Sequence, residues 1–218
     1  LMLINKRLLK IADFISSNSF ILDVGCDHAL LDVYLALEKK CTCLASDIHD
    51  GPILKAKLNL LKYKVTKQVK LLTCDGIPNI KTDVDYLVLS GMGAITICNI
   101  LERGDLSLIK KIIVSPNGEE ELVRKKLNEL NYKTLKEELV RDKNIIYPVL
   151  MYEKGTEKLT KMEIKYGKLL MNNKDSLYQE YYTKKIDTYK NIKKGLPKKY
   201  IIKKIKLHKK IREISSIL

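Results

Sequence analysis

The chain has 218 residues, of which 45% are hydrophobic, so it is long enough to bury a full core and too apolar for a disordered protein. No run of about 18 uncharged apolar residues is present, which argues against a membrane-spanning helix. Its five cysteines are scattered through apolar segments and indicate reduced thiols rather than a disulfide framework. We therefore expect a cytoplasmic protein with no membrane partner.

The net charge of +15 is distributed unevenly along the chain. Residues 154–218 hold 18 lysines and Arg212 against six acidic residues, so nearly all of the excess positive charge lies in this tail. A concentrated basic surface favours a polyanionic partner, because lysine and arginine displace the counterions of phosphates. RNA or DNA is the partner we expect, and an ordinary solvated lysine-rich surface is the alternative.

The first two thirds of the chain alternate between apolar runs and helix-length segments. The runs predict strands at 20–24, 42–46, 69–73, 85–90 and 111–115. Between and around them the pattern predicts helices at 5–17, 28–39, 51–62, 93–102 and 118–130. Repeated strand–helix units are typical of a Rossmann-like, doubly wound α/β sheet that is mostly parallel.

Two further extended segments, 132–140 and 145–152, have no helix of useful length between them. We expect them to form a final antiparallel pair. Pro148 cannot donate a hydrogen bond to a neighbouring strand, so it should occupy a bulge or an edge position. Asn117 precedes the helix predicted at 118–130 and is a candidate for its N-cap.

The pattern changes after Glu153, where no strand signal returns. Apolar residues at helical spacing predict helices at 160–172, 175–194 and 198–217, with the last two separated by Gly195-Leu196-Pro197. We therefore place domain boundaries at 1–153 and 154–218, the second an α-helical, coiled-coil-like hairpin. Two apolar stripes should pack together in it: Tyr178, Tyr182, Ile186 and Tyr189, and Tyr200, Leu207, Ile211, Ile214 and Leu218.

The first predicted strand runs into Asp23-Val24-Gly25-Cys26-Asp27-His28-Ala29, a loop of the nucleotide-binding kind. Gly25 lets the backbone turn and approach a ligand closely. A dinucleotide-binding motif would also need glycines at 27 and 30, where this chain has Asp27 and Leu30. Carboxylates from Asp23 and Asp27 would instead attract the cationic amine and sulfonium of S-adenosylmethionine. His28 remains open as a catalytic base, a cofactor contact or a structural donor.

Acidic residues and glycines follow the other predicted strands at the same edge of the sheet. Asp47, followed by Ile48, is placed to accept hydrogen bonds from ribose hydroxyls, and Asp75-Gly76 is placed beside an adenine ring. Ser90, Gly91 and Met92 end the fourth strand and should contact both cofactor and substrate. Asn117 follows the fifth strand and could face a target base. A metal is not expected, because Cys41 and Cys43 have no second Cys or His pair at metal-ligand spacing.

Taken together, these motifs resemble the bacterial tRNA (adenine(22)-N1)-methyltransferases, which are class I S-adenosylmethionine-dependent enzymes. The resemblance is carried by the loop at 23–29, Asp75-Gly76, Gly91-Met92-Gly93 and Pro116-Asn117. The family usually has G-M-G-G and Q-P-N, where this chain has Ala94 and Ser115. The resemblance implies methylation of N1 of adenine 22 in tRNA, with activity in the D-arm region. We expect the enzyme to be a monomer.

Adenine N1 already carries a lone pair at neutral pH, so the reaction needs positioning more than a strong base. The methylated ring is cationic, and Asp27, Ser90 or the carbonyl of Gly91 is a candidate to stabilise it, with Asn117 facing the base. Two other functions remain open: a methyltransferase acting on another RNA or a small molecule, and a non-catalytic RNA-binding module.

Overall fold

The computed structural model describes residues 4–218, and within that range seven strands form one sheet in the order β3-β2-β1-β4-β5-β7-β6. The strands are Phe20–Val24 (β1), Thr42–Asp47 (β2), Val69–Thr73 (β3), Val84–Ser90 (β4), Ile109–Ser115 (β5), Tyr132–Asp142 (β6) and Ile145–Lys154 (β7). The first five pair in parallel, and β7 pairs antiparallel with both β5 and β6. The predicted α/β sheet with a final antiparallel pair is confirmed.

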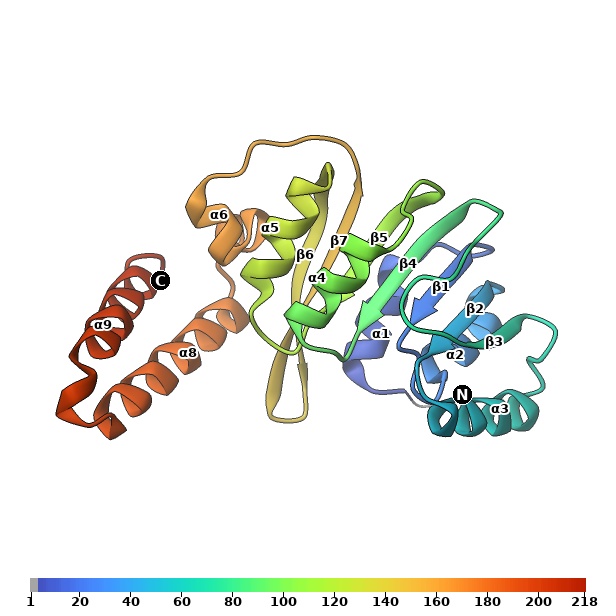
Figure 1. Cartoon of the computed structure of the whole chain (residues 1–218), viewed down its shortest axis with the longest axis horizontal. Helices are drawn as coiled ribbons and strands as arrows, with labels where there is room; N and C mark the ends of the chain where they lie inside the picture. The colour runs from blue at the N-terminus through green and yellow to red at the C-terminus, as the bar shows by residue number, and fades with distance from the viewer. Residues whose placement is uncertain (1–3) are drawn as a thin grey trace. The chain divides into compact units, whose positions relative to one another are not determined.

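Helices cover both faces of the sheet, with α1 and α2 behind it and α4 and α5 in front in Figure 1. They span Lys6–Phe14 (α1), Leu30–Lys39 (α2), Asp50–Tyr63 (α3), Ala94–Arg103 (α4), Glu120–Glu129 (α5) and Lys161–Tyr166 (α6). Successive strand residues face opposite ways, so Ile21 packs in the core under α1 and α2 while Leu22 packs in the core under α4 and α5.

Several element boundaries differ from those predicted, and each difference has a local cause. The helix expected to begin at residue 28 begins at Leu30, because Asp27 and Ala29 both adopt the left-handed backbone conformation. The helix expected over 160–172 is interrupted at Gly167, where φ is +87°. Asn117 is not the cap of α5, since that helix has Glu119 at its N-cap. Its side chain bonds elsewhere, as described below.

Pro148 lies in the part of β7 that extends past β5. The pairing of β5 with β7 runs from Lys111–Glu153 to Val114–Leu150, whereas Pro148 is opposite Leu139 of β6. On the side away from β6, no residue of β5 is paired with Pro148, so its missing N–H leaves the sheet intact. Pro148 thus has an edge-like position within β7.

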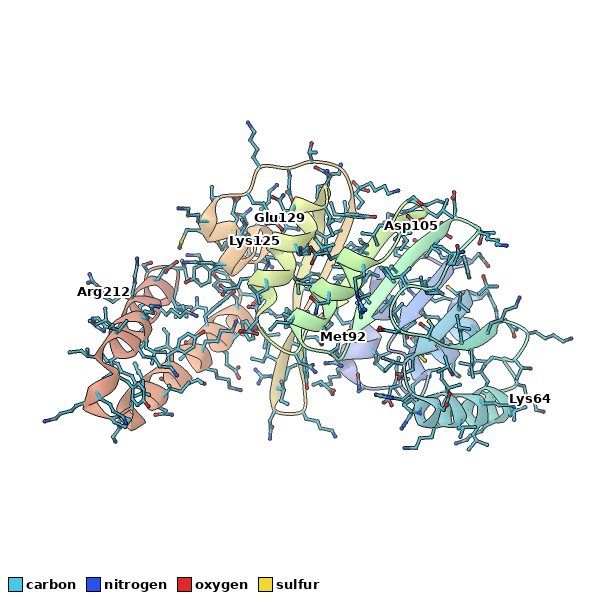
Figure 2. The ribbon with its side chains drawn as sticks, viewed as in Figure 1. Lys64, Met92, Asp105, Lys125, Glu129 and Arg212 are labelled. Atoms are coloured by element: carbon cyan, nitrogen blue, oxygen red, sulfur yellow. The ribbon has the colours of Figure 1, made fainter. Side chains whose placement is uncertain are left out.

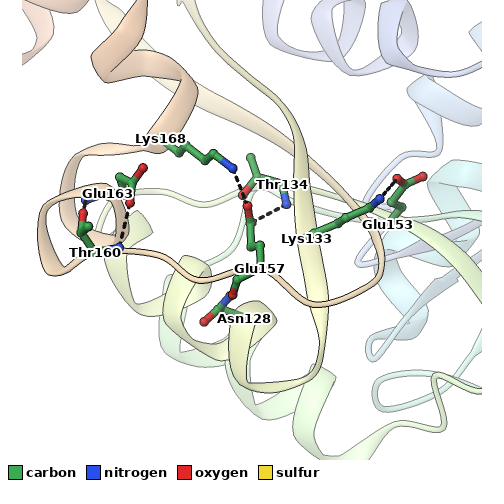
Figure 3. A network of polar contacts seen from close by, with 8 residues as sticks. All are labelled: Asn128, Lys133, Thr134, Glu153, Glu157, Thr160, Glu163 and Lys168. Carbon is green, nitrogen blue, oxygen red and sulfur yellow. Dashed lines mark hydrogen bonds and ion pairs between the residues drawn. The ribbon is translucent and has the colours of Figure 1, made fainter.

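The chain divides into two compact units, the first ending at Lys168 and the second covering Leu169–Leu218. The division lies beyond the boundary expected at Glu153, because residues after β7 are bound to α5 and β6. Glu157 accepts hydrogen bonds from both the backbone and the hydroxyl of Thr134, each at 2.6 Å, and pairs with Lys168 at 3.0 Å (Figure 3). Asn128 also donates to the Glu157 carbonyl.

The second unit is helical. Its elements are α7 (Lys168–Asn172, which begins one residue earlier), α8 (Ser176–Gly195), a 3-10 turn (Lys198–Tyr200) and α9 (Ile201–Ser215). Helices α8 and α9 form the expected hairpin, with Tyr178, Tyr182 and Ile186 of the first stripe buried. Of the second stripe Leu207 and Ile214 are buried, but Tyr200 is exposed because it lies in the turn at the tip.

Among the described residues, no helix is both long and apolar enough to cross a membrane.

Candidate functional site

A cavity of about 540 Å³ opens at the carboxyl ends of the parallel strands. A volume of this size suits a small organic ligand. It is lined by residues from the ends of β1, β2, β3 and β4 and from helices α1 and α4. The lining includes nine of the predicted site residues: Gly25, Asp27, Asp47, Ile48, Asp75, Gly76, Ser90, Gly91 and Met92. Residues distant in the sequence meet here because parallel strands end at the same edge.

Gly25 lies close to the Met92 side chain, which follows the end of β4. Its φ is +82°, and a Cβ built on it would lie 2.5 Å from the terminal methyl carbon of Met92. Figure 2 labels Met92 at the end of β4, where α4 begins. The Gly25 and Cys26 amides both donate to the Ser46 carbonyl, which fixes the loop against the end of β2. Only glycine fits this position without displacing Met92.

Asp47 is held by two backbone amides rather than by a cation. The Asp27 N–H donates to its Oδ2 at 3.2 Å, and the His49 N–H donates to its Oδ1 at 3.1 Å. Each carboxylate oxygen accepts a second hydrogen bond readily, so Asp47 retains acceptor capacity toward the cavity. The geometry fits the role expected for an acid that receives two neighbouring hydroxyls.

Asp75 is engaged differently, because Arg103 of α4 makes a two-pronged contact with it. The guanidinium NH1 and NH2 lie 3.1 and 3.2 Å from the two carboxylate oxygens. Both side chains are more than half exposed. An adenine amino group that bonded to Asp75 would have to share it with Arg103, a residue that the sequence motifs do not indicate.

Asn117 does not line the cavity but fixes one of its walls. Its Nδ2 donates to the Gly91 carbonyl at 2.6 Å, and its Oδ1 accepts from Arg7 at 2.9 Å. Arg7 itself lines the cavity and lies over the ring of Tyr147 at 4.4 Å. Burial lowers the pKa of Arg7 from its ordinary value. Arg7 belongs to α1, 110 residues before Asn117, so no local pattern singles it out.

Two of the remaining predicted residues, His28 and Asp23, are not part of the cavity lining. His28 is near Asp27, with its Nε2 3.3 Å from Oδ1, and is partly exposed. Asp23 is buried and outside the cavity lining. Ser90 lines the cavity, and its hydroxyl oxygen is buried with no hydrogen-bond partner among the described residues. An unpaired buried hydroxyl in a cavity wall is a candidate ligand contact. Thr96 and Asn99 of α4, which sequence reasoning missed, also line the cavity.

Comparison with known proteins supplies the family. Residues 21–216 match the TrmK family, described as tRNA (adenine(22)-N(1))-methyltransferase. This chain belongs to that family. A Bacillus subtilis protein named tRNA (adenine(22)-N(1))-methyltransferase is 32% identical over 70% of this chain, and the alignment spans 66% of that relative.

Solved structures agree with this assignment. Mycoplasma capricolum TrmK, determined with S-adenosylhomocysteine, has a TM-score of 0.88 and 26% identity, and the match covers 99% of this chain and 97% of that one. A Rossmann-superfamily protein from Streptococcus agalactiae has a TM-score of 0.93 at 24% identity, with 100% and 98% covered, and supports the fold.

Proposed function

We propose that this chain is an S-adenosylmethionine-dependent methyltransferase that acts on N1 of adenine 22 in tRNA. The observation that carries the proposal is the cavity itself, in a chain of this family. Its wall combines the close-approach glycines 25 and 91 with Asp47, whose oxygens are oriented by two backbone amides. The bound cofactor would supply the methyl group, and the residues of the chain position the base that receives it.

Positioning is the main task of the chain, since adenine N1 needs no deprotonation before it attacks. Arg7 and Asn117 hold the Gly91 segment in place, and we assign them to orienting the base. The unpaired Ser90 hydroxyl and the Asp27 carboxylate are the groups we assign to the developing positive charge of the ring. Asp27 is well exposed, so its contribution depends on the bound substrate excluding water.

Labelled methyl transfer tests this proposal directly. A tRNA transcript with adenine at position 22 should incorporate label, and the digested product should contain N1-methyladenosine. Replacing that adenine with guanine should abolish incorporation. Asp47→Ala should abolish it as well, whereas Asp83→Asn, which alters an exposed acid paired with Lys110, should not. Methylation of a different nucleoside would mean that adenine 22 is not the substrate. If the unaltered chain bound tRNA without methylating it, a non-catalytic RNA-binding module would be favoured.

We assign tRNA binding in the D-arm region to the basic residues 154–218. From Lys190 to Arg212 the chain has eleven basic residues and no acidic one. In the hairpin, Lys193 and Lys194 of α8 and Lys204 and His208 of α9 border one groove. Phosphates that enter such a surface release counterions, so binding should weaken steeply with salt.

Two charge-reversal variants of the full-length chain, one in the tail and one elsewhere, test the role of the tail. Changing Lys193, Lys194, Lys198 and Lys199 to Glu should weaken tRNA binding and flatten its salt dependence. The slope should fall by up to about one logarithmic unit for each phosphate that the tail no longer neutralises. The control changes Lys55, Lys57, Lys62 and Lys64 of the α3 region to Glu and so alters the net charge equally. Equal losses in both variants would mean that only the overall charge matters.

We further propose that the enzyme is a monomer and that it acts in the cytoplasm, where a tRNA substrate is found. Light scattering of the free protein and cell fractionation test these two assignments. A dimer that persists at nanomolar concentration would overturn the first.

A further inference from the structure

Beneath the loop that begins the cavity lies a pair of buried carboxyl groups, Asp23 of β1 and Asp32 of α2. Asp32 has no exposed surface and Asp23 is 5% exposed. No donor in the described residues reaches either Asp32 carboxyl oxygen in ordinary hydrogen-bond geometry. Asp32 interacts most strongly with the Asp23 carboxyl, and more weakly with its own backbone N–H and with the Cys43 thiol. Buried carboxylates are normally paired with a cation, so this arrangement requires an explanation.

A hydrogen bond between two carboxyl groups requires a proton between them. Burial raises the pKa of Asp23 well above its ordinary value, and the neighbouring Asp32 and Asp47 carboxyls raise it further. Burial also raises the pKa of Asp32, to about 6, against the lowering effect of its contact with Asp23. The two groups titrate as a pair that cannot ionise fully without placing two negative charges side by side.

The surroundings offer the pair no compensating cation among the residues that the structure describes. The groups that face it are the Cys26 and Cys43 thiols and the Asp47 carboxylate. Burial raises the pKa of both thiols, so they stay neutral at physiological pH. Gly25, two residues after Asp23, lines the cavity. A positive charge bound in that cavity would therefore be the counter-charge that the pair lacks.

We propose that Asp32 is a positioning residue for the cofactor: it shares one proton with Asp23, and a cationic cofactor entering the adjoining cavity expels that proton. The O–H bond between the pair breaks, the proton passes to solvent, and the pair becomes fully ionised beside the cofactor. This inference rests on the proposed S-adenosylmethionine site, but the shared proton exists without a ligand and can be measured without one.

The sign of the pH dependence follows from the proton balance. Cofactor binding that releases a proton becomes tighter as pH rises, by at most tenfold per pH unit, until the free protein has lost the proton itself. The pair's contribution to the stability of the free protein has the opposite pH dependence and falls as pH rises. Because the folded-state pKa of the pair is raised, the stabilisation is fully present below the unfolded pKa of an aspartate, about 4, and is lost as pH rises from there through the folded values, of which that of Asp32 is about 6.

Asp32→Asn tests the proposal with little change of shape. The amide introduced by this substitution would donate to Asp23 and leave it ionised, so the variant should gain melting temperature relative to the wild type as pH rises from 6 to 8.5. Calorimetry of S-adenosylmethionine binding in buffers of different ionisation enthalpy should show proton release for the wild type and almost none for the variant. Asp83→Asn, which alters an exposed acid, should behave as the wild type does.

The outcomes are distinguishable. Equal proton release and equal pH profiles for the wild type and Asp32→Asn would overturn the proposal, whatever the enzyme methylates. If that variant does not fold, carboxyl-carbon NMR of the wild type decides: the Asp23 and Asp32 signals should titrate together above pH 6, and independent titration near pH 4 would overturn the shared proton. If S-adenosylmethionine does not bind the wild type at any pH, the proposed function fails instead, while the NMR and melting results still stand.

Discussion

The cavity edge and the seam between α5, β6 and residues 155–168 use polar side chains in opposite ways. At the seam the charged groups are paired: Arg124 and Glu137 form a buried ion pair at 2.6 Å, and Glu157 accepts from Thr134 and Lys168. At the cavity edge the Ser90 hydroxyl, and beneath its first loop the Asp32 carboxyl, are buried without a donor or acceptor of ordinary geometry in the described residues.

This contrast indicates that the paired groups at the seam serve stability and the unpaired groups at the cavity serve ligand binding. Paired groups at the seam join an extended segment to the sheet, and they leave little capacity for a ligand. Unpaired groups and left-handed residues at the cavity edge cost stability, and such features are found where a ligand completes the interactions. Substitutions at the seam should therefore mainly change unfolding, and substitutions at the cavity should mainly change binding and turnover.

The largest expected effect is at the buried ion pair. Arg124→Met should lower the free energy of unfolding by about 3–5 kcal/mol, because it leaves the Glu137 carboxylate buried without its cation. Urea denaturation measures this. The double variant Arg124→Met/Glu137→Leu should recover most of the loss, since no uncompensated charge remains. A double variant as unstable as the single one would mean that the seam depends on packing rather than on charge pairing.

At the cavity, Gly25→Val should lower kcat/KM for tRNA methylation roughly 100-fold through displacement of Met92 and the first loop. A β-branched residue at φ +82° is also strained. Gly51→Ala is the matched control, because a Cβ there meets nothing within 4 Å. Steady-state kinetics on protein with an intact thermal transition make the comparison. If both glycine variants retain full activity, close approach at residue 25 is not required.

Glu157→Gln should cost about 1–2 kcal/mol at neutral pH, because hydrogen bonds to a charged acceptor are replaced by weaker ones. Burial raises the pKa of Glu157, but hydrogen bonds from Thr134 and Lys168 outweigh burial and hold it below its ordinary value. Such a group stabilises the fold above its unfolded pKa, and the benefit is lost as pH falls through the lower folded pKa. The stability difference between the variant and the wild type should thus close below about pH 4. A difference independent of pH would contradict this.

The smallest effect is expected on the exposed surface of α5, where Figure 2 labels Lys125 and Glu129. Their charged groups are 3.8 Å apart and both side chains are more than half exposed. Lys125→Ala should change the free energy of unfolding by no more than about 0.5 kcal/mol. Denaturation at low and high salt checks this, and a decrease of more than about 1 kcal/mol would place Lys125 in a larger charge network.

Local sequence determined the strands, their mostly parallel pairing and the residues at their ends. Apolar runs and the Asp-Gly and Gly-Met-Gly segments act within a few residues, so β1 and β3 were predicted with their observed bounds. Those same local signals brought nine predicted residues into one cavity. They also indicated the helical hairpin, because its apolar residues recur at helical spacing.

Tertiary structure alone decided the partners of the charged residues. Arg7 with Asn117, Arg103 with Asp75, and Asp32 with Asp23 join elements that the chain brings together only on folding. Arg124, which is paired with Glu137, likewise donates to the Lys165 carbonyl and so binds the segment after β7 to the first unit, which ends at Lys168. The periodicity of apolar residues indicates which face of an element is buried. A buried polar pair depends instead on the distance between its two groups and on their removal from water, and these are set only when the elements pack together.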